Sequence, residues 1–122
     1  MKRDDTYTYD EIFPLEITEG LPEAKTALKQ VEFELASMRA RGGHLMKIVH
    51  DGRLGSSRER LRAEVRRQLR VFRKEGRIVL MIPGESFSMT DNATRYLVDR
   101  CPQVELDRDI DKKNGDFTLV YL

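Results

Sequence analysis

The residue types that could do chemistry in this sequence gather in two places, a histidine beside acidic residues and a run of arginines that follows it. His50 comes directly before Asp51, and an imidazole there can act as a general acid or base near neutral pH. A histidine beside an acid is also common as a hydrogen-bonded structural residue. Glu19, Asp51 and Glu85 could place water or a divalent cation near His50 if the loops that carry them converge.

A strongly basic segment lies after the histidine. From Arg53 to Arg77 the chain has ten basic and three acidic residues, whereas the rest of the chain has a net charge of −6. Arginines with a four-residue spacing lie on one flank of a helix, where their guanidinium groups can bind phosphate oxygens. The arginines with this spacing are Arg58, Arg62, Arg66 and Arg70. This pattern favours a nucleic acid as ligand. The alternative is a set of salt bridges with the acidic segment Asp107–Asp116.

The loop between His50 and this basic helix could itself bind an anion. Gly52 and Gly55 permit tight turns, and Ser56 with Ser57 would begin a helix whose free amide groups face the loop. The other interpretation is a glycine loop that only makes a turn. The residues predicted to contact a phosphate backbone are Arg53, Gly55, Ser56, Ser57, Arg58, Arg62, Arg66 and Arg70.

Strands and helices that would position these residues alternate along the chain. The predicted strands are Leu15–Thr18, Leu45–His50, Ile78–Ile82, Val104–Leu106 and Phe117–Leu122. One predicted helix has an apolar stripe from Leu21 to Met38, a second runs from Ser56 to near Gly76, and a third is capped within Thr90–Asn92. The unbroken apolar run Ile78–Ile82 favours a strand covered on both faces in the centre of a parallel sheet.

This βαβαβαββ order predicts an α/β domain with a mostly parallel sheet, helices packed against it and an antiparallel pair at its end. Residues 1–14 are expected to form a flexible arm and residues 15–122 the domain. In such a sheet the carboxyl ends of the first three strands share one edge. That edge would bring Glu19, His50, Asp51 and Glu85 together with the glycine loop.

Length and composition exclude several classes of protein. A chain of 122 residues is one domain, and its longest apolar run of five residues is too short to span a membrane. The single cysteine, Cys101, cannot form an internal disulfide or a multi-thiolate metal site, which favours a reducing compartment. No histidine or cysteine cluster has ligand spacing, so no zinc site is predicted. We expect a cytoplasmic protein.

Five blocks of the sequence, in order, resemble the Small MutS-related (Smr) domain, in a divergent branch of small stand-alone members. The blocks are Leu15–Gly20, Glu23–Ala24, Ile48–Arg53, Leu61–Leu69 and Gly115–Leu122. The resemblance implies an Smr-like α/β sandwich that binds DNA or RNA and, as in several members of the family, has endonuclease activity. Thr18 stands where the family has a histidine, and Asp51 and Arg53 stand where it has glycines.

Three functions are therefore compatible with the sequence. The first is binding of a DNA or RNA backbone through the basic helix, with little readout of the bases. The second is an endonuclease in which His50 is the acid or base, aided by Glu19, Asp51 or Glu85, with Mg²⁺ or Mn²⁺ as a cofactor in that case only. The third is a protein-interaction module whose arginine face docks an acidic partner.

Overall fold

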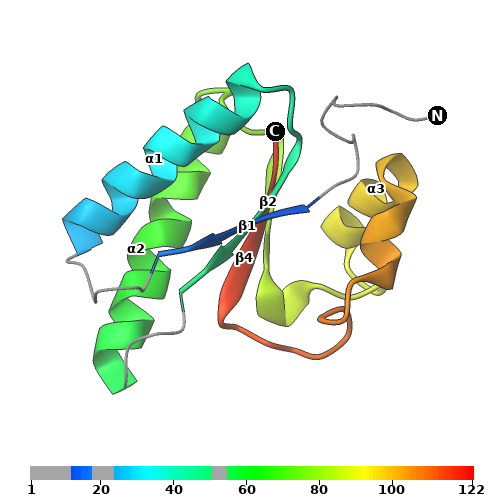
Figure 1. Ribbon diagram of the computed structural model, residues 1–122. Coiled ribbons are helices and arrows are strands. Elements are labelled where there is room, and N and C mark those ends of the chain that lie inside the picture. Colours follow the sequence, from blue (N-terminus) through cyan, green and yellow to red (C-terminus); the bar gives the residue numbers. More distant parts are fainter. Residues whose placement is uncertain (1–11, 18–23, 51–54) are drawn as a thin grey trace.

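The computed structural model describes residues 12–17, 24–50 and 55–122. Four strands, three α-helices and two short 3₁₀ helices are formed by these residues (Figure 1). In chain order they are β1 (Ile12–Glu16), α1 (Ala24–Ala40), β2 (Leu45–Val49), α2 (Gly55–Lys74), β3 (Leu80–Pro83), η1 (Gly84–Ser86), α3 (Asn92–Arg100), η2 (Pro102–Leu106) and β4 (Phe117–Tyr121). The α/β fold predicted from the element order is confirmed, with one sheet. None of the described helices has the length and apolar character needed to cross a membrane.

The strands form a single mixed sheet in the order β1-β2-β4-β3. β1 pairs with β2 in parallel, whereas β4 pairs antiparallel with both β2 and β3. The expectation of a mostly parallel sheet is therefore wrong for the hydrogen-bonded pairs. β1, β2 and β3 do run in one direction, but β4 lies between β2 and β3 and separates them.

Three predicted strands differ from the observed elements. Val104–Leu106 is part of the 3₁₀ helix η2 rather than a strand, and Pro102 at its first position favours such a turn. β3 lies at the edge of the sheet and not at its centre, although helices cover both of its faces. β1 begins at Ile12, inside the predicted arm, and includes Pro14, which an edge strand tolerates because its missing N–H can face away from the sheet.

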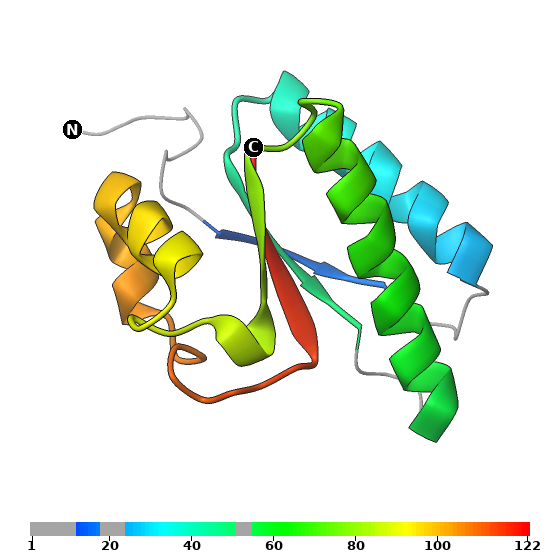
Figure 2. The same cartoon turned by 180° about the vertical axis from the view of Figure 1, so that it is seen from behind.

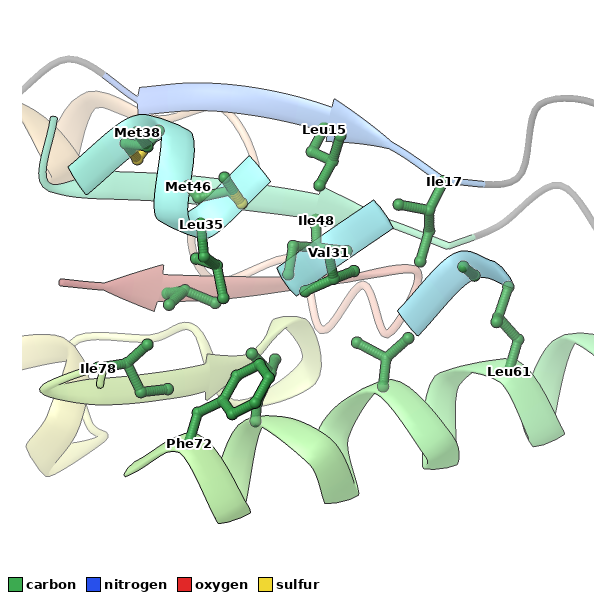
Figure 3. Packing of buried hydrophobic residues seen from close by; sticks show 14 residues of the cluster. Leu15, Ile17, Val31, Leu35, Met38, Met46, Ile48, Leu61, Phe72 and Ile78 are labelled. Atoms are coloured by element: carbon green, nitrogen blue, oxygen red, sulfur yellow. The ribbon is translucent and has the colours of Figure 1, made fainter. Parts of the chain in front are cut away.

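One face of the sheet is covered by α1 and α2, which lie side by side (Figures 1 and 2). The predicted stripe of α2 is buried, and of the predicted α1 stripe Val31, Leu35 and Met38 are buried and Leu28 is partly buried, while Leu21 lies outside the described residues. Figure 3 shows side chains of these stripes packed against β1 and β2. The buried apolar residues of the two helices are Ala27, Val31, Leu35, Met38, Leu61, Val65, Leu69 and Phe72. This packing fixes the rotation of α2 about its axis, and with it the direction in which each arginine points.

The opposite face is covered by α3 and η2. Asp91 caps α3 by accepting a hydrogen bond from the Thr94 amide at 2.9 Å, as predicted for this segment. Leu97, Cys101 and Val104 pack there against Leu119 of β4. All five residues of β4 are buried, because this strand contributes side chains to both cores.

The carboxyl ends of β1, β2 and β3 meet at one edge, as predicted, because these strands share a direction. We call it the carboxyl edge. At this edge the loop after β3 lies against the segment that leads into β4. A Cβ atom on Gly84 would lie 2.0 Å from the Asn114 carbonyl oxygen, so only glycine allows this approach. The close contact brings the η1 residues beside Gly115 and Phe117.

Candidate functional site

A hydrogen-bonded cluster around Arg66 occupies the carboxyl edge, between α2 and the sheet. Arg66 lies on the flank of α2 next to its apolar stripe, one helical turn from Arg62. Only 8% of the residue is exposed, in contrast to Arg70 in the following turn, which is exposed. α2 therefore directs one member of the predicted arginine row into the protein.

The Arg66 guanidinium makes five hydrogen bonds. Nη1 and Nη2 donate to the two carboxylate oxygens of Glu85, both at 2.8 Å. Nε donates to Oγ1 of Thr118 at 3.0 Å, and Nη2 also donates to the carbonyl oxygens of Gly115 at 3.3 Å and Phe117 at 3.1 Å. The side chain thus joins α2, η1 and the start of β4. We call Arg66, Glu85, Thr118 and His50 the Arg66 network.

His50 completes the network from the end of β2. Its Nε2 lies 3.0 Å from Oγ1 of Thr118, and its backbone amide donates to the Asp116 carbonyl at 2.9 Å. Thr118 Oγ1 thus takes part in hydrogen bonds with both Arg66 and His50, and the tautomer of the imidazole decides which atom donates in the second. The residue is fully buried, and Nδ1 has no hydrogen-bond partner among the described residues.

Burial and nearby cations determine the charge states of the network. Burial first, and then the positive charge of Arg66, lower the pKa of His50 from 6.5 to about 4. The imidazole is therefore neutral at pH 7. The hydrogen bonds from Arg66 lower the pKa of Glu85, which keeps this carboxylate ionised. The network thus contains one partly buried ion pair and one neutral histidine at physiological pH.

The Arg66 network can hold parts of the fold together, but its capacity for acid–base chemistry is restricted. Arg66 fixes the segment before β4 through its hydrogen bonds to the Gly115 and Phe117 carbonyls. The neutral, buried imidazole of His50 cannot act as a general acid near neutral pH. Of the two predicted catalytic residues that the structure describes, His50 and Glu85, only the Glu85 side chain is partly open, at 44% exposure. The structure brings these two residues into one network, and their catalytic roles stay predictions.

Arg66 is not available to a phosphate backbone, because its donors are directed to the protein itself. This corrects the predicted phosphate-binding set. Arg66 also does not form the alternative salt bridge with Asp107–Asp116, because the group of this segment that it contacts is the backbone carbonyl of Gly115. Asp107 and Asp109 instead pair with Lys47 on the other face of the sheet.

Other cations of α2 remain on its surface. Arg62 is half-buried and donates to the Gly115 carbonyl at 3.4 Å, while Arg67 pairs with Glu64 on the same helix. No carboxylate of the described residues lies within ion-pair distance of the remaining described cations of α2. These are Arg60, Arg62, Arg70, Arg73 and Lys74. The helix therefore presents a cationic surface along much of its length.

Several predicted site residues lie outside the described residues. They are Thr18, Glu19, Asp51, Gly52 and Arg53. Gly55, Ser56, Ser57 and Arg58 form the first turn of α2, whose backbone begins at Gly55 as the phosphate-loop prediction requires. The predicted convergence of Glu19 and Asp51 on His50 therefore stays a prediction.

Thr118 is the site residue that the sequence interpretation missed. It is fully buried, and it bridges His50 and Arg66. A signal was present, because Thr118 is the one non-aromatic polar residue in the β4 segment FTLVY. A buried hydroxyl needs a hydrogen-bond partner, and here it has two.

Within the described parts of the chain, no group of three or more histidine, cysteine, aspartate or glutamate side chains is placed to hold a metal ion. Comparison of the chain with protein-family models, with curated proteins and with solved structures found no match.

Proposed function

We propose that this protein binds the phosphodiester backbone of a nucleic acid through α2. The observation that carries the proposal is the cationic surface of this helix, which has eight basic and two acidic residues. Five of its described cations have no carboxylate partner among the described residues, while the chain outside Arg53–Arg77 is net acidic. A concentrated positive surface on an acidic protein is the pattern expected of a polyanion-binding face.

The binding surface centres on Arg62 and Arg70, which lie on one flank of the helix on either side of the buried Arg66. The start of α2 at Gly55 adds free amide groups at the carboxyl edge. Arg66 supports this surface indirectly, because it holds the Gly115 carbonyl that Arg62 also contacts. Contacts of this kind are to phosphates, so we expect weak dependence on base sequence.

The Smr resemblance supports the same ligand class. The resembling block Leu61–Leu69 lies on α2 and the block Gly115–Leu122 includes β4, and these blocks contribute Arg66 and Thr118 to the Arg66 network. We accordingly propose an Smr-like domain whose function is backbone binding. The nuclease alternative has no support from His50, which is buried and neutral.

The test is a titration of the purified protein against a fluorescently labelled DNA duplex and a labelled RNA at several salt concentrations. We expect log K to fall linearly with log salt for the wild type. The variant Arg62→Gln/Arg70→Gln should reduce the magnitude of the slope by about two for the duplex, because each phosphate contact contributes about 0.9.

The matched control is Lys29→Gln/Arg108→Gln, which removes the same charge from two exposed residues outside α2. It should leave the salt slope within about 0.5 of the wild-type value. A slope near zero for the wild type, or an equal loss in the control, would contradict the proposal.

A further inference from the structure

A groove runs along the open edge of the sheet, at the opposite end of α2 from the carboxyl edge. β3 is the last strand in the sheet order, so one of its sides pairs with β4 and the other has no partner strand among the described residues. α2 and α3 cover opposite faces of the sheet (Figures 1 and 2). Both helices contribute residues to the lining of the groove. Its volume is about 490 Å³ and its lining residues are Arg73, Val79, Leu80, Met81, Asn92, Ala93 and Tyr96.

The floor of the groove offers both backbone groups and apolar side chains. An edge strand presents N–H and C=O groups that can pair with another strand, and proteins usually protect such edges. Here β3 itself carries no charged residue, and the apolar side chains of Val79 before it and Tyr96 on α3 are 44% and 40% exposed. An extended peptide that adds to a sheet edge uses these same features, with backbone pairing for affinity and side-chain contacts for specificity.

The walls of the groove carry positive charge. Arg73 is exposed on α2, and no described carboxylate lies within ion-pair distance of it. On α3, the Arg100 guanidinium lies 3.7 Å from the ring centroid of Tyr96, and its contact with the largely exposed Asp99 is long, at 3.8 Å. None of the described lining residues is acidic. The groove therefore complements an acidic ligand.

We propose that this groove binds an extended acidic segment of another protein, which adds to β3 as a further strand. Apolar side chains of the segment contact Val79 and Tyr96, and its carboxylates pair with Arg73 and Arg100. Arg73 lies at the far end of the cationic surface of α2, eleven residues or about 16 Å from Arg62 and three residues from Arg70.

A second copy of this chain is a poor occupant of the groove. Antiparallel pairing of two β3 strands about a twofold axis perpendicular to the sheet would continue the sheet and keep both α2 helices on the same face. Each α2 has eight basic and two acidic residues, so the two helices would repel each other. Charge complementarity instead favours a chain rich in aspartate and glutamate.

The test uses a fluorescently labelled peptide of about eight residues in which valine or isoleucine alternates with glutamate, a usual length for a strand. A peptide with lysine in place of glutamate is the charge control. We expect saturable binding of the acidic peptide and at least about tenfold weaker binding of the lysine peptide. In hydrogen exchange, amides within Leu80–Pro83 should gain protection when the acidic peptide binds.

Arg73→Glu should weaken binding of the acidic peptide by about tenfold or more, whereas Arg108→Glu, with the same charge change outside the groove, should change it by less than about twofold. Absence of binding, equal effects of the two substitutions, or protection confined to other elements would overturn the proposal. A concentration-dependent dimer that protects the β3 amides would overturn it in favour of a second copy. Displacement of the peptide from β3 by an RNA oligonucleotide would overturn it in favour of a longer nucleic-acid surface.

Discussion

Arg66 shows how a single residue can look like a ligand-binding group in the sequence and be a structural one in the fold. Its spacing from Arg62 and Arg70 is that of a continuous row, yet its five hydrogen bonds all go to the protein. The four-residue spacing places a residue on a flank of the helix. The spacing does not show whether the neighbouring elements supply hydrogen-bond acceptors at that position along the helix. Here Glu85 of η1 and the Phe117 carbonyl of β4 are the acceptors.

The Arg66 network should contribute strongly to stability. We expect Arg66→Ala to lower the free energy of unfolding by about 2–4 kcal/mol, because Glu85, Thr118 and two carbonyls lose their donor. Arg67→Ala is the matched control on the same helix. Arg67 is exposed and its partner Glu64 is half-buried on the helix surface, so the loss should stay below about 1 kcal/mol. Urea unfolding measures the free energy of unfolding of both variants, and equal losses would contradict the structural role of Arg66.

His50 should make the protein less stable in mild acid. The unfolded state takes up a proton on this imidazole near pH 6.5, whereas the folded state does so only near the lowered pKa of about 4. The unfolded state therefore binds more protons between these values, and the free energy of unfolding falls as the pH falls through this window. The loss attributable to His50 is at most about 3 kcal/mol.

His50→Gln removes this titration, so the variant should show a flatter dependence of unfolding free energy on pH between about 6.5 and 4.5. Glu85 acts at lower pH, since its stabilising ionised form is lost only below its ordinary pKa of 4.5. Urea unfolding at a series of pH values measures the dependence. An unchanged slope in His50→Gln would show that the imidazole is not held neutral.

At the scale of the elements, the sequence was informative where side chains repeat with a period and uninformative about which elements are neighbours. The spacing of Leu61, Val65 and Leu69 predicted the buried side of α2, and all three are at most 1% exposed. The apolar run Ile78–Ile82 correctly indicated cover on two faces. It could not show that β4 would take the central position and leave β3 at the edge, because strand order depends on pairing between distant segments.

The segment Val104–Leu106 illustrates a second limit. Alternation of apolar and polar residues over three positions is too short to separate a strand from a 3₁₀ turn. Pro102 and the preceding end of α3 decide the outcome, and Val104 packs against the core from η2. Residues of the candidate site that come from such connections, such as Gly115, were accordingly the hardest to predict.

The whole molecule is organised around β4, which shares side chains between the two cores. Val120 packs toward α1 and α2, and Leu119 packs toward α3. We therefore expect both sides to unfold together. Leu69→Ala on the α2 side and Leu97→Ala on the α3 side should each lower the free energy of unfolding by about 2–5 kcal/mol.

In each variant, circular dichroism and tyrosine fluorescence should give the same unfolding midpoint. The first signal is dominated by the helices, and the second includes Tyr96 and Tyr121 on the α3 side of the sheet. Two separate midpoints in Leu97→Ala would show that the α3 side can unfold by itself.

The central position of β4 also bears on synthesis of the chain. β1 and β2 are made first and can pair with each other, but among the described strands β3 pairs only with β4, so the four-stranded sheet is complete only after residues 117–121 have been made. Until then the cationic α2 and the apolar strands are in a nascent chain without a closed core. The completion of the sheet is thus tied to one late event of long-range pairing.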